Sequence, residues 1–423
     1  MVQAPVKSSG PICHRLANGL TIVAEQVPVE AVSFGLWVQA GSAVEPDPIN
    51  GMAHFLEHMV FKGSQRLPGG EFERRVEQRG GNTNAATSQD YTHYHVTVAP
   101  ADFAAIAPDQ IELVLNASLE SEAFERERLV VLEEIRRAAD NPRQRIFQQF
   151  IQLAYAELPY RRPVLGPTEV IADLSPQQMR QHHQHWYQPQ TMTAIAVGNL
   201  PVEQLMATIE AGLADLPTYP VPQLPAWQPE PPFQTIVRQH QDDPTLQQAR
   251  LVMLWRVPGI ADLEQTYALD VLARILGSGR TSRLVQDLRE ERGLVSSIAV
   301  SNMTQALQGI FSISAQLPIE NLAVVEAAIA QQIETLRQDL MQPHELAQVR
   351  TQTANQFIFR NETPDNRASL YGYYQAIAGD LSPALDYPER IQAITAEAVQ
   401  TAAQTYLNPV AYGIFTCHQP LST

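Results

Sequence analysis

Residues 51–61 read Gly-Met-Ala-His-Phe-Leu-Glu-His-Met-Val-Phe, the most specific pattern in this chain of 423 residues. On a helix, His54 and His58 are four residues apart and lie on one face, so two imidazole nitrogens can converge on one metal ion. Glu57 is next to His58, so its carboxylate reaches the same side. The other residues of the stretch are mostly apolar and can be buried. The pattern therefore predicts a helix that forms one wall of a metal-binding cleft.

This set of residue types suits zinc-assisted hydrolysis. Zinc acidifies a water molecule, and a carboxylate that does not bind the metal can take the proton while the water attacks a peptide carbonyl. The order of residues 54–58 is the reverse of His-Glu-x-x-His and corresponds to the inverted zinc peptidase signature. The alternative is an amphipathic core helix that carries two histidines by chance. The flanking Gly51-Met52-Ala53 and Met59-Val60-Phe61 favour the metal site.

A catalytic zinc site normally has a third protein ligand, and the best candidates lie in the helical segment 124–135. Glu127 and Glu134 are seven residues apart, so they share a helix face and can point together into a cleft. Glu125 and Glu133 project elsewhere, and we expect them to be solvated. From spacing alone, each of these glutamates could equally be a surface charge. We expect the buried stripe of this helix to comprise Leu129, Leu132 and Ile135.

Taken together, these motifs resemble the M16 metallopeptidases, the family of pitrilysin, insulin-degrading enzyme and mitochondrial processing peptidase. His54–His58 is followed 76 residues later by Glu134. Asn18-Gly19-Leu20-Thr21 resembles the first strand of the family, and Gly80–Thr87 its substrate-binding edge strand. Arg126–Glu134 is similar to its second active-site helix. The resemblance spans nearly the whole chain and points to the short-subunit M16B type.

The resemblance implies a role for each matching residue. His54, His58 and Glu134 would hold one Zn²⁺ per chain, and Glu57 would be the general base. Glu127 would be the acid that orients a zinc ligand. The implied activity is a metalloendopeptidase that hydrolyses short or unfolded peptides inside a chamber.

Substrate binding is expected at the polar segment that follows Gly80 and Gly81. An extended peptide could add to an exposed edge strand there through backbone hydrogen bonds, which ignore side-chain identity. The competing interpretation, which the sequence alone favours, is a plain turn after the glycine pair. The resemblance assigns this substrate-binding strand to Asn84, Ala85, Ala86 and Thr87.

Charge and composition exclude several classes of function. The 29 Lys and Arg residues against 45 Asp and Glu residues give a net charge of −16, which disfavours nucleic acid as a partner. No apolar stretch approaches the ~20 residues of a membrane span. The N-terminus lacks the apolar core of a secretory signal. Because Cys13 and Cys417 are the only cysteines, we predict a reducing compartment, the bacterial cytoplasm, with an organelle after import as the alternative.

Seven prolines between residues 217 and 232 mark a boundary, because proline fixes φ and lacks an amide donor. We predict a zinc-bearing half at 1–216, a stiff linker at 217–232 and a homologous half without zinc at 233–423. Each half is expected to be an α+β unit, a mainly antiparallel sheet packed with helices as in the LuxS/MPP-like fold.

Matching segments support this internal repeat. The helical run before Trp186 and the strand 193–198 have counterparts before Tyr406 and at 411–415. Alignment of the halves places Val271 and Ile275 near the positions of His54 and His58. Only the first half is therefore expected to carry chemistry.

One departure from the family concerns the partner. Family members that act alone carry an Arg and, seven residues later, a Tyr that helps bind the substrate carbonyl. Here Arg289 is present, but Ser296 stands at the tyrosine position, and a serine hydroxyl is too short for that role. We therefore predict a heterodimer with a related subunit that carries the Arg/Tyr pair, as in the processing peptidases, and a homodimer as the alternative.

Two further hypotheses concern other classes. The chain could be a non-catalytic assembly subunit, or a module that binds peptides without cutting them.

His182, His183 and His185 could form a second metal site, but no acid lies nearby, and we interpret them as polar helix surface.

Overall fold

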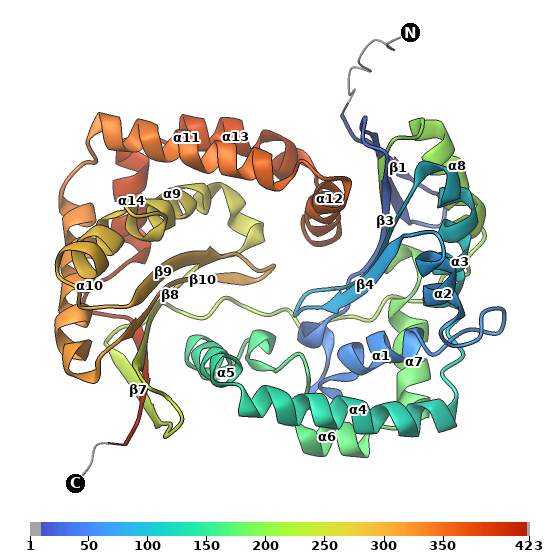
Figure 1. The fold of residues 1–423 in the computed structure, drawn as a ribbon, viewed down its shortest axis with the longest axis horizontal. Helices are drawn as coiled ribbons and strands as arrows, with labels where there is room; N and C mark the ends of the chain where they lie inside the picture. Colours follow the sequence, from blue (N-terminus) through green and yellow to red (C-terminus); the bar gives the residue numbers. More distant parts are fainter. Residues whose placement is uncertain (1–9, 421–423) are drawn as a thin grey trace. The chain divides into compact units, whose positions relative to one another are not determined.

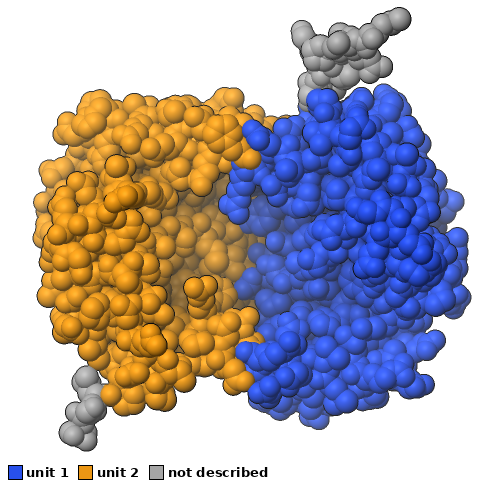
Figure 2. All heavy atoms as spheres, in the orientation of Figure 1, with its two compact units in different colours: residues 1–137, 162–225, 360–384 blue, residues 138–161, 226–359, 385–423 orange. Residues whose placement is uncertain are grey.

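The computed structural model describes residues 10–420, which form alternating helices and strands (Figure 1). Contacts between Cα atoms divide the chain into two compact units (Figure 2). The first unit comprises residues up to 137, 162–225 and 360–384, and the second comprises residues 138–161, 226–359 and those from 385 onward.

The first unit contains a six-stranded sheet with the order β1-β2-β6-β3-β5-β4. Its neighbours are antiparallel except β2 and β6, which run parallel. The central strands β3 and β6 are buried along their whole length, as expected for strands covered on both faces. The strands are β1 (Ile12–Arg15), β2 (Thr21–Gln26), β3 (Val32–Val38), β4 (Asn82–Thr87), β5 (Thr92–Val98) and β6 (Met192–Gly198).

The second unit contains a five-stranded sheet with the order β7-β11-β8-β10-β9. Again one pair, β7 and β11, is parallel and the other neighbours are antiparallel. This order repeats β2-β6-β3-β5-β4 of the first sheet strand by strand, so the predicted α+β fold with two similar, mainly antiparallel sheets is confirmed. The strands are β7 (Val237–Asp242), β8 (Ala249–Pro258), β9 (Ser297–Met303), β10 (Gln308–Leu317) and β11 (Gly413–His418).

Helices pack on both sheets. In the first unit α1, α3, α7 and α8 share an apolar core with one face of the sheet, and in the second unit α9, α10 and α14 do the same. The helices are α1 (Met52–Val60), α2 (Glu71–Glu77), α3 (Phe103–Leu115), α4 (Ser121–Asp140), α5 (Pro142–Ala154), α6 (Thr168–Asp173), α7 (Pro176–Trp186), α8 (Val202–Leu213), α9 (Tyr267–Gly277), α10 (Leu322–Gln338), α11 (Pro343–Arg360), α12 (Pro364–Ala378), α13 (Ser382–Ala393) and α14 (Ala396–Tyr406).

The compact units differ from the predicted sequential halves, because each half contributes one helix to the other unit. Helix α12 belongs to the second half of the chain, yet Tyr371 packs on the outer face of the first sheet with Trp37. The Tyr371 hydroxyl also donates a hydrogen bond of 2.8 Å to Glu25. In return α5 packs on β8 and β11 of the second sheet, where Arg256 donates to the carbonyl of Ala154 at 2.7 Å. On this face each sheet is covered in part by a helix from the other half of the chain; the face is apolar in the first sheet and carries several serines in the second.

Residues 217–232 contain no helix or strand, as the prolines predict. Their last part is fastened to the second unit by Glu230. One carboxylate oxygen of Glu230 accepts from the amides of Glu157 and Leu158 at 2.8 and 3.0 Å, and the other lies 2.8 Å from Arg256. The segment is thus an ordered connection at its C-terminal end.

Candidate active site

Helix α1 places both histidines of the motif on one side. Its first turn begins at Gly51, which has a φ of +96° and leaves no room for a Cβ, since that atom would lie 2.6 Å from Ile171. The apolar residues of α1 pack into the core of the first unit. His54 is 7% exposed, and its ring centroid lies 4.8 Å from that of His58. The local sequence therefore presents two imidazoles together at the edge of a buried helix.

Glu45 holds the N-terminus of α1 in place. Its buried carboxylate accepts hydrogen bonds from the amide of Gly51 at 2.7 Å and from the amide of Ala53 at 2.6 Å. The side-chain amide of Asn50 donates to the same group at 2.9 Å. Burial raises the pKa of Glu45 to about 7, while these hydrogen bonds act in the opposite direction. In its ionised form the group satisfies amides that lack partners within the helix and complements the helix dipole. The sequence analysis did not identify Glu45, and no spacing rule points to it.

Glu134 reaches the two histidines from α4. Its Oε2 lies 3.7 Å from Nε2 of His54 and 3.4 Å from Nε2 of His58. Two ligands of a tetrahedral zinc with bonds of about 2.0–2.1 Å stand about 3.3–3.5 Å apart, so the arrangement matches the size of such a site. Burial and the neighbouring His58 lower the pKa of His54 to about 3, so its imidazole is neutral at neutral pH, as metal binding requires. The structure thus brings the three predicted ligands together.

Glu127 orients one of these ligands. Its Oε1 lies 3.0 Å from Nδ1 of His58, and its Oε2 lies 2.7 Å from the ammonium group of Lys62. A carboxylate on the second nitrogen of a metal-binding histidine fixes the ring and raises its basicity. Lys62, which the sequence analysis did not single out, holds that carboxylate in turn. Nδ1 of His54, by contrast, is buried and has no hydrogen-bond partner among residues 10–420.

Glu57 is positioned by the neighbouring strand. The hydroxyl of Thr87 donates to Oε2 of Glu57 at 2.5 Å. Burial raises the pKa of Glu57 above its usual value, while the Thr87 hydrogen bond and the nearby His58 act in the opposite direction. Glu57 is therefore a largely desolvated carboxyl group, the environment that suits a general base near neutral pH. Thr87 was predicted as part of the substrate strand, and the structure adds this contact to Glu57.

Helix α4 differs in part from its predicted pattern. Leu129 is 68% exposed, so the predicted stripe of Leu129, Leu132 and Ile135 is wrong at its first member. The buried side of α4 is formed by Phe124, Glu127 and Val131, because the helix points Glu127 and Glu134 toward the histidines of α1. The other two glutamates are exposed, as predicted, and pair with Arg128 and Arg136 of the same helix.

Residues 84–87 lie on an edge strand. Within residues 10–420, β4 pairs with β5 alone, so its other side has no strand partner. The alternative of a plain turn is wrong for these residues. The side chain of Asn84 accepts a hydrogen bond from the amide of Ala85 at 2.9 Å, and Ala86 pairs with His93 in the ladder. The strand contacts α1, which carries the histidines.

In the described residues of the second unit, α9 presents no ligands at the positions that correspond to His54 and His58. Val271 and Ile275 on α9 are buried in its apolar core. Arg289 lies on the π-helix η7 (Val285–Glu291), and its guanidinium pairs with the adjacent Glu290. The hydroxyl of Ser296 donates to Gln248 at 2.8 Å.

The other histidines do not assemble a comparable site. His182 is buried, which corrects its assignment to polar surface, and Nε2 of His183 lies 2.8 Å from the carbonyl oxygen of Val114. Within residues 10–420 one further group has metal-ligand types close together, namely His240, Asp242 and His418. His240 and Asp242 are exposed on β7, and His418 is half-buried at the end of β11, whose other residues are mostly buried.

The donor set of the first unit fits zinc. Two imidazole nitrogens and one carboxylate oxygen are the ligands of the His₂Glu type of catalytic zinc site. His54, His58 and Glu134 are the residues that could hold the ion, with Glu57 beside them and outside the ligand set. A helix-borne histidine pair completed by a carboxylate from a second helix is an arrangement that suits a catalytic metal site, here on a duplicated α+β fold.

Comparisons with known proteins identify the family. The family model described as insulinase (peptidase family M16) matches residues 21–168, and the model described as the peptidase M16 inactive domain matches residues 173–353. The chain belongs to the M16 peptidase family. The inactive-domain match begins within the first half of the chain and extends over residues 233–353 of the second.

Curated relatives extend over almost the whole chain. An uncharacterized zinc protease of Mycobacterium bovis is 27% identical over 411 residues, which are 96% of this chain and 92% of the relative. An uncharacterized zinc protease of Bacillus subtilis is 26% identical over 391 residues, 92% of this chain and 93% of the relative. These names associate zinc and proteolysis with the relatives.

Solved structures show the same fold. A protease from Helicobacter pylori aligns with a TM-score of 0.89 at 24% identity, over 97% of this chain and all of the other. A structure from Pseudomonas fluorescens, described as a peptidase M16 inactive domain, aligns with a TM-score of 0.86 at 19% identity over 98% of this chain and 99% of the other.

Proposed function

We propose that this chain is a zinc-dependent endopeptidase that hydrolyses short or unfolded peptides and binds one Zn²⁺. The observation that carries the proposal is the convergence of His54, His58 and Glu134, whose ligand atoms all lie within 4.8 Å of one another, with Glu57 on the same helix as the histidine pair. The names of the relatives support zinc and proteolysis.

The residues of the chain have separate roles in this reaction. Zinc supplies Lewis acidity that polarises a peptide carbonyl and acidifies water. Glu57 takes the proton of the attacking water and passes it to the leaving amine. Thr87 keeps the Glu57 carboxylate in one orientation. Glu127 keeps the His58 ring in the tautomer whose Nε2 is available to the metal.

The substrate is proposed to bind as an additional strand on β4. The free edge can form backbone hydrogen bonds with an extended peptide, and residues 84–87 bring that peptide beside Glu57, because Thr87 already contacts it. Backbone recognition predicts broad tolerance of sequence and selection for unfolded chains.

A Glu57→Gln variant tests the reaction. It should retain zinc and lose peptide turnover by at least about a hundredfold, the lower end of the contribution of a general base. Glu125→Gln is the matched control, because that carboxylate is exposed on α4. Unchanged turnover in Glu57→Gln, or absence of zinc from the unmodified chain, would favour a peptide-binding or non-catalytic assembly subunit.

We further propose that the active form is a heterodimer, with a homodimer as the alternative. Ser296 is engaged with Gln248 and has no phenol to offer a substrate carbonyl, so a related partner would supply the Arg/Tyr pair. Loss of one such donor lowers the rate by about 10²–10³-fold. Peptide cleavage by the purified chain alone should therefore be weak and should rise when a related subunit is added. Equal activity of the isolated chain would refute the heterodimer.

A reducing compartment is proposed for the chain, the bacterial cytoplasm in the first place. Both cysteines are free, with Cys13 exposed and Cys417 buried. Among the described helices, none combines the length and hydropathy needed to cross a bilayer.

A further inference from the structure

The second unit contains a cavity of about 370 Å³ between α5 and one face of its sheet. This volume falls in the range of about 300–1,000 Å³ that is usual for ligand sites. The lining comes from three strands and one helix, all within the same compact unit. The strands contribute Arg250, Leu251, Val252, Ser297, Ala299, Ser301, Met303, Ser312, Ser314, Ala315 and Gln316, and the helix contributes Arg143, Ile146, Phe147 and Phe150.

The cavity exists because the face of the sheet that borders it carries many small side chains, here called the floor of the cavity. Ser314 on β10 stands between Val252 of β8 and Ala299 of β9, and Ser312 pairs with Ser301. Side chains of this size leave unfilled space above a sheet, whereas the outer face of the first sheet is filled by large residues. The floor therefore combines open space with hydroxyl groups, and α5 adds an apolar wall.

Two cations face this space without an anion. Arg143 and Arg250 both line the cavity, and within residues 10–420 neither has a carboxylate at ion-pair distance. The guanidinium of Arg250 reaches only the carbonyl of Gln248, at 3.3 Å. Burial and the charge of Arg143 lower the pKa of Arg250. The positive charge of each arginine therefore destabilises the charged form of the other.

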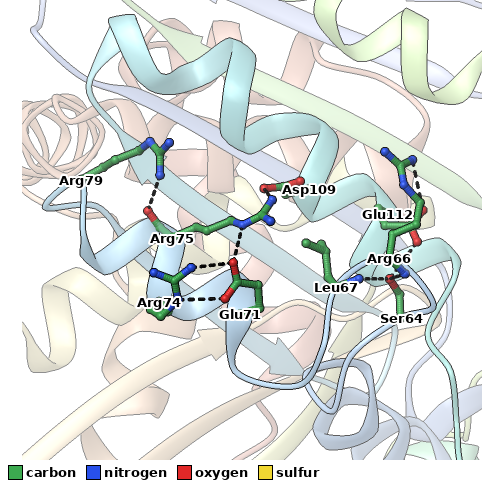
Figure 3. A network of polar contacts seen from close by, with 9 residues as sticks. All are labelled: Ser64, Arg66, Leu67, Glu71, Arg74, Arg75, Arg79, Asp109 and Glu112. Carbon is green, nitrogen blue, oxygen red and sulfur yellow. Dashed lines mark hydrogen bonds and ion pairs between the residues drawn. The ribbon is translucent and has the colours of Figure 1, made fainter.

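Many other arginines of this acidic chain have a carboxylate partner. On α2, Arg74 and Arg75 share the carboxylate of Glu71, and Arg75 also reaches Asp109 at 2.9 Å (Figure 3). A net charge of −16 makes carboxylates abundant. Arg143 is exposed and Arg250 is half-buried, and a pair of arginines left without a carboxylate lacks a charge that a ligand can provide.

The cavity also adjoins an edge strand. β9 is the last strand of the second sheet, and it occupies the place that β4 has in the first. The residues that line the cavity from β9 alternate along it, so they share one face. An extended peptide added to the free edge of β9 would carry alternate side chains, or its own end, over the cavity.

We propose that this cavity binds a carboxylate of a peptide, with Arg143 and Arg250 as the anion-binding pair and the α5 wall contacting adjacent apolar side chains. The carboxylate is either the C-terminus of the peptide or an acidic side chain, since both offer the same chemistry to a guanidinium. The identity of the ligand as a peptide rests on the proposed function, but its binding requires no turnover. The cavity is thus a recognition site separate from the zinc ligands in the sequence and in its structural unit.

Fluorescence anisotropy on the full-length Glu57→Gln protein with zinc tests the proposal. Three labelled peptides of one sequence are compared: a free C-terminal acid, its amide, and the amide with a glutamate near the end. We expect at least one carboxylate-bearing peptide to bind about tenfold more tightly than the plain amide at 0.15 M salt, as for a charge-assisted contact that solvent partly screens. The peptide that shows the gain identifies the source of the carboxylate.

Variants assign the effect to the two arginines. Arg143→Gln with Arg250→Gln should reduce the ratio of affinities to about one. Arg74→Gln with Arg280→Gln is the matched control, because it removes the same charge at exposed arginines that already have carboxylate partners, and it should keep the ratio. If the double glutamine variant fails to fold, Arg143→Lys with Arg250→Lys retains both charges and should keep the ratio.

Equal binding of the three peptides by the Glu57→Gln protein, or no binding, would overturn the proposal. So would a ratio that survives in the Arg143→Gln, Arg250→Gln variant. Turnover of the same peptides by the wild-type chain is measured separately. A chain that binds the acid selectively but cleaves nothing therefore contradicts the peptidase proposal and leaves this inference standing.

Discussion

Replacement of Glu45 by glutamine is expected to weaken both the fold of the first unit and its affinity for zinc. The Glu45 carboxylate accepts from the amides of Gly51 and Ala53 on different oxygens, at 2.7 and 2.6 Å. A glutamine has one oxygen and one NH₂ group. In either orientation of the new amide, its NH₂ group faces a backbone N–H, so at least one buried amide loses its acceptor.

The magnitude follows from these contacts. One buried amide without an acceptor costs about 1–3 kcal/mol, and loss of the anion at the helix N-terminus adds about 0.3–1 kcal/mol. We therefore expect the free energy of unfolding to fall by about 1–4 kcal/mol at a pH above 7, where the Glu45 carboxyl is ionised. His54 is the third residue of α1, so this end of the helix must be ordered when zinc binds. Part of the lost stability therefore lowers the affinity for zinc. With tenfold in affinity for each 1.4 kcal/mol, zinc affinity should fall by about tenfold to a hundredfold.

Competition with a chelator of known affinity measures the affinity for zinc. Denaturant unfolding of the metal-free protein measures the free energy of unfolding. Glu125→Gln is the control, because it makes the same chemical change at an exposed position of α4. Glu45→Gln with wild-type zinc affinity and wild-type stability would refute the reasoning. A loss of stability alone would show that Glu45 supports the fold without positioning the ligands.

Three further predictions concern other contacts. Glu127→Gln should lower zinc affinity about 10–100-fold through the His58 ring, as equilibrium dialysis can measure, and an unchanged affinity would contradict the orienting role. Burial raises the pKa of Asp270 from 3.8 to about 6, so its favourable contribution is complete below pH 4 and is lost as pH rises through 6. Asp270→Asn should therefore gain up to ~3 kcal/mol of unfolding free energy relative to wild type between pH 4 and 7, and a flat difference would contradict the shift. Gly372→Ala would place a Cβ 2.0 Å from the indole nitrogen of Trp37, so it should lower stability by about 1–3 kcal/mol or more in thermal unfolding, and a wild-type melting temperature would mean that α12 does not pack there.

Much of the metal centre was predictable because it depends on helical spacing. His54 and His58 are four positions apart in the sequence, and Glu127 and Glu134 are seven positions apart. The structure places each pair on one helix face, as the 3.6-residue period requires. The same period misassigned Leu129, because α4 contains more apolar residues than it buries. A helical period gives the relative directions of side chains, but it does not say which direction faces the core.

Contacts that join distant segments were beyond prediction from the pattern. Glu45 lies in an irregular stretch before α1, and its contacts to the helix amides depend on the path of that loop. Thr87 reaches Glu57 only because β4 packs beside α1. Lys62 follows the motif in sequence but acquires its role from Glu127, 65 residues further along the chain.

The amino-acid sequence by itself determined the helix that bears the histidines, the acidic helix that follows, the repeated α+β unit and the proline-rich segment at 217–232. Each of these depends on local periodicity or on the restricted backbone of proline. Only the tertiary structure decided that α5 and α12 each join the unit of the other half, and that Arg143 and Arg250 share a cavity without a counter-ion. The physical reason is that the burial of apolar surface has no preferred direction. An apolar face therefore predicts that some element covers it, but which element does so depends on the packing of the whole chain.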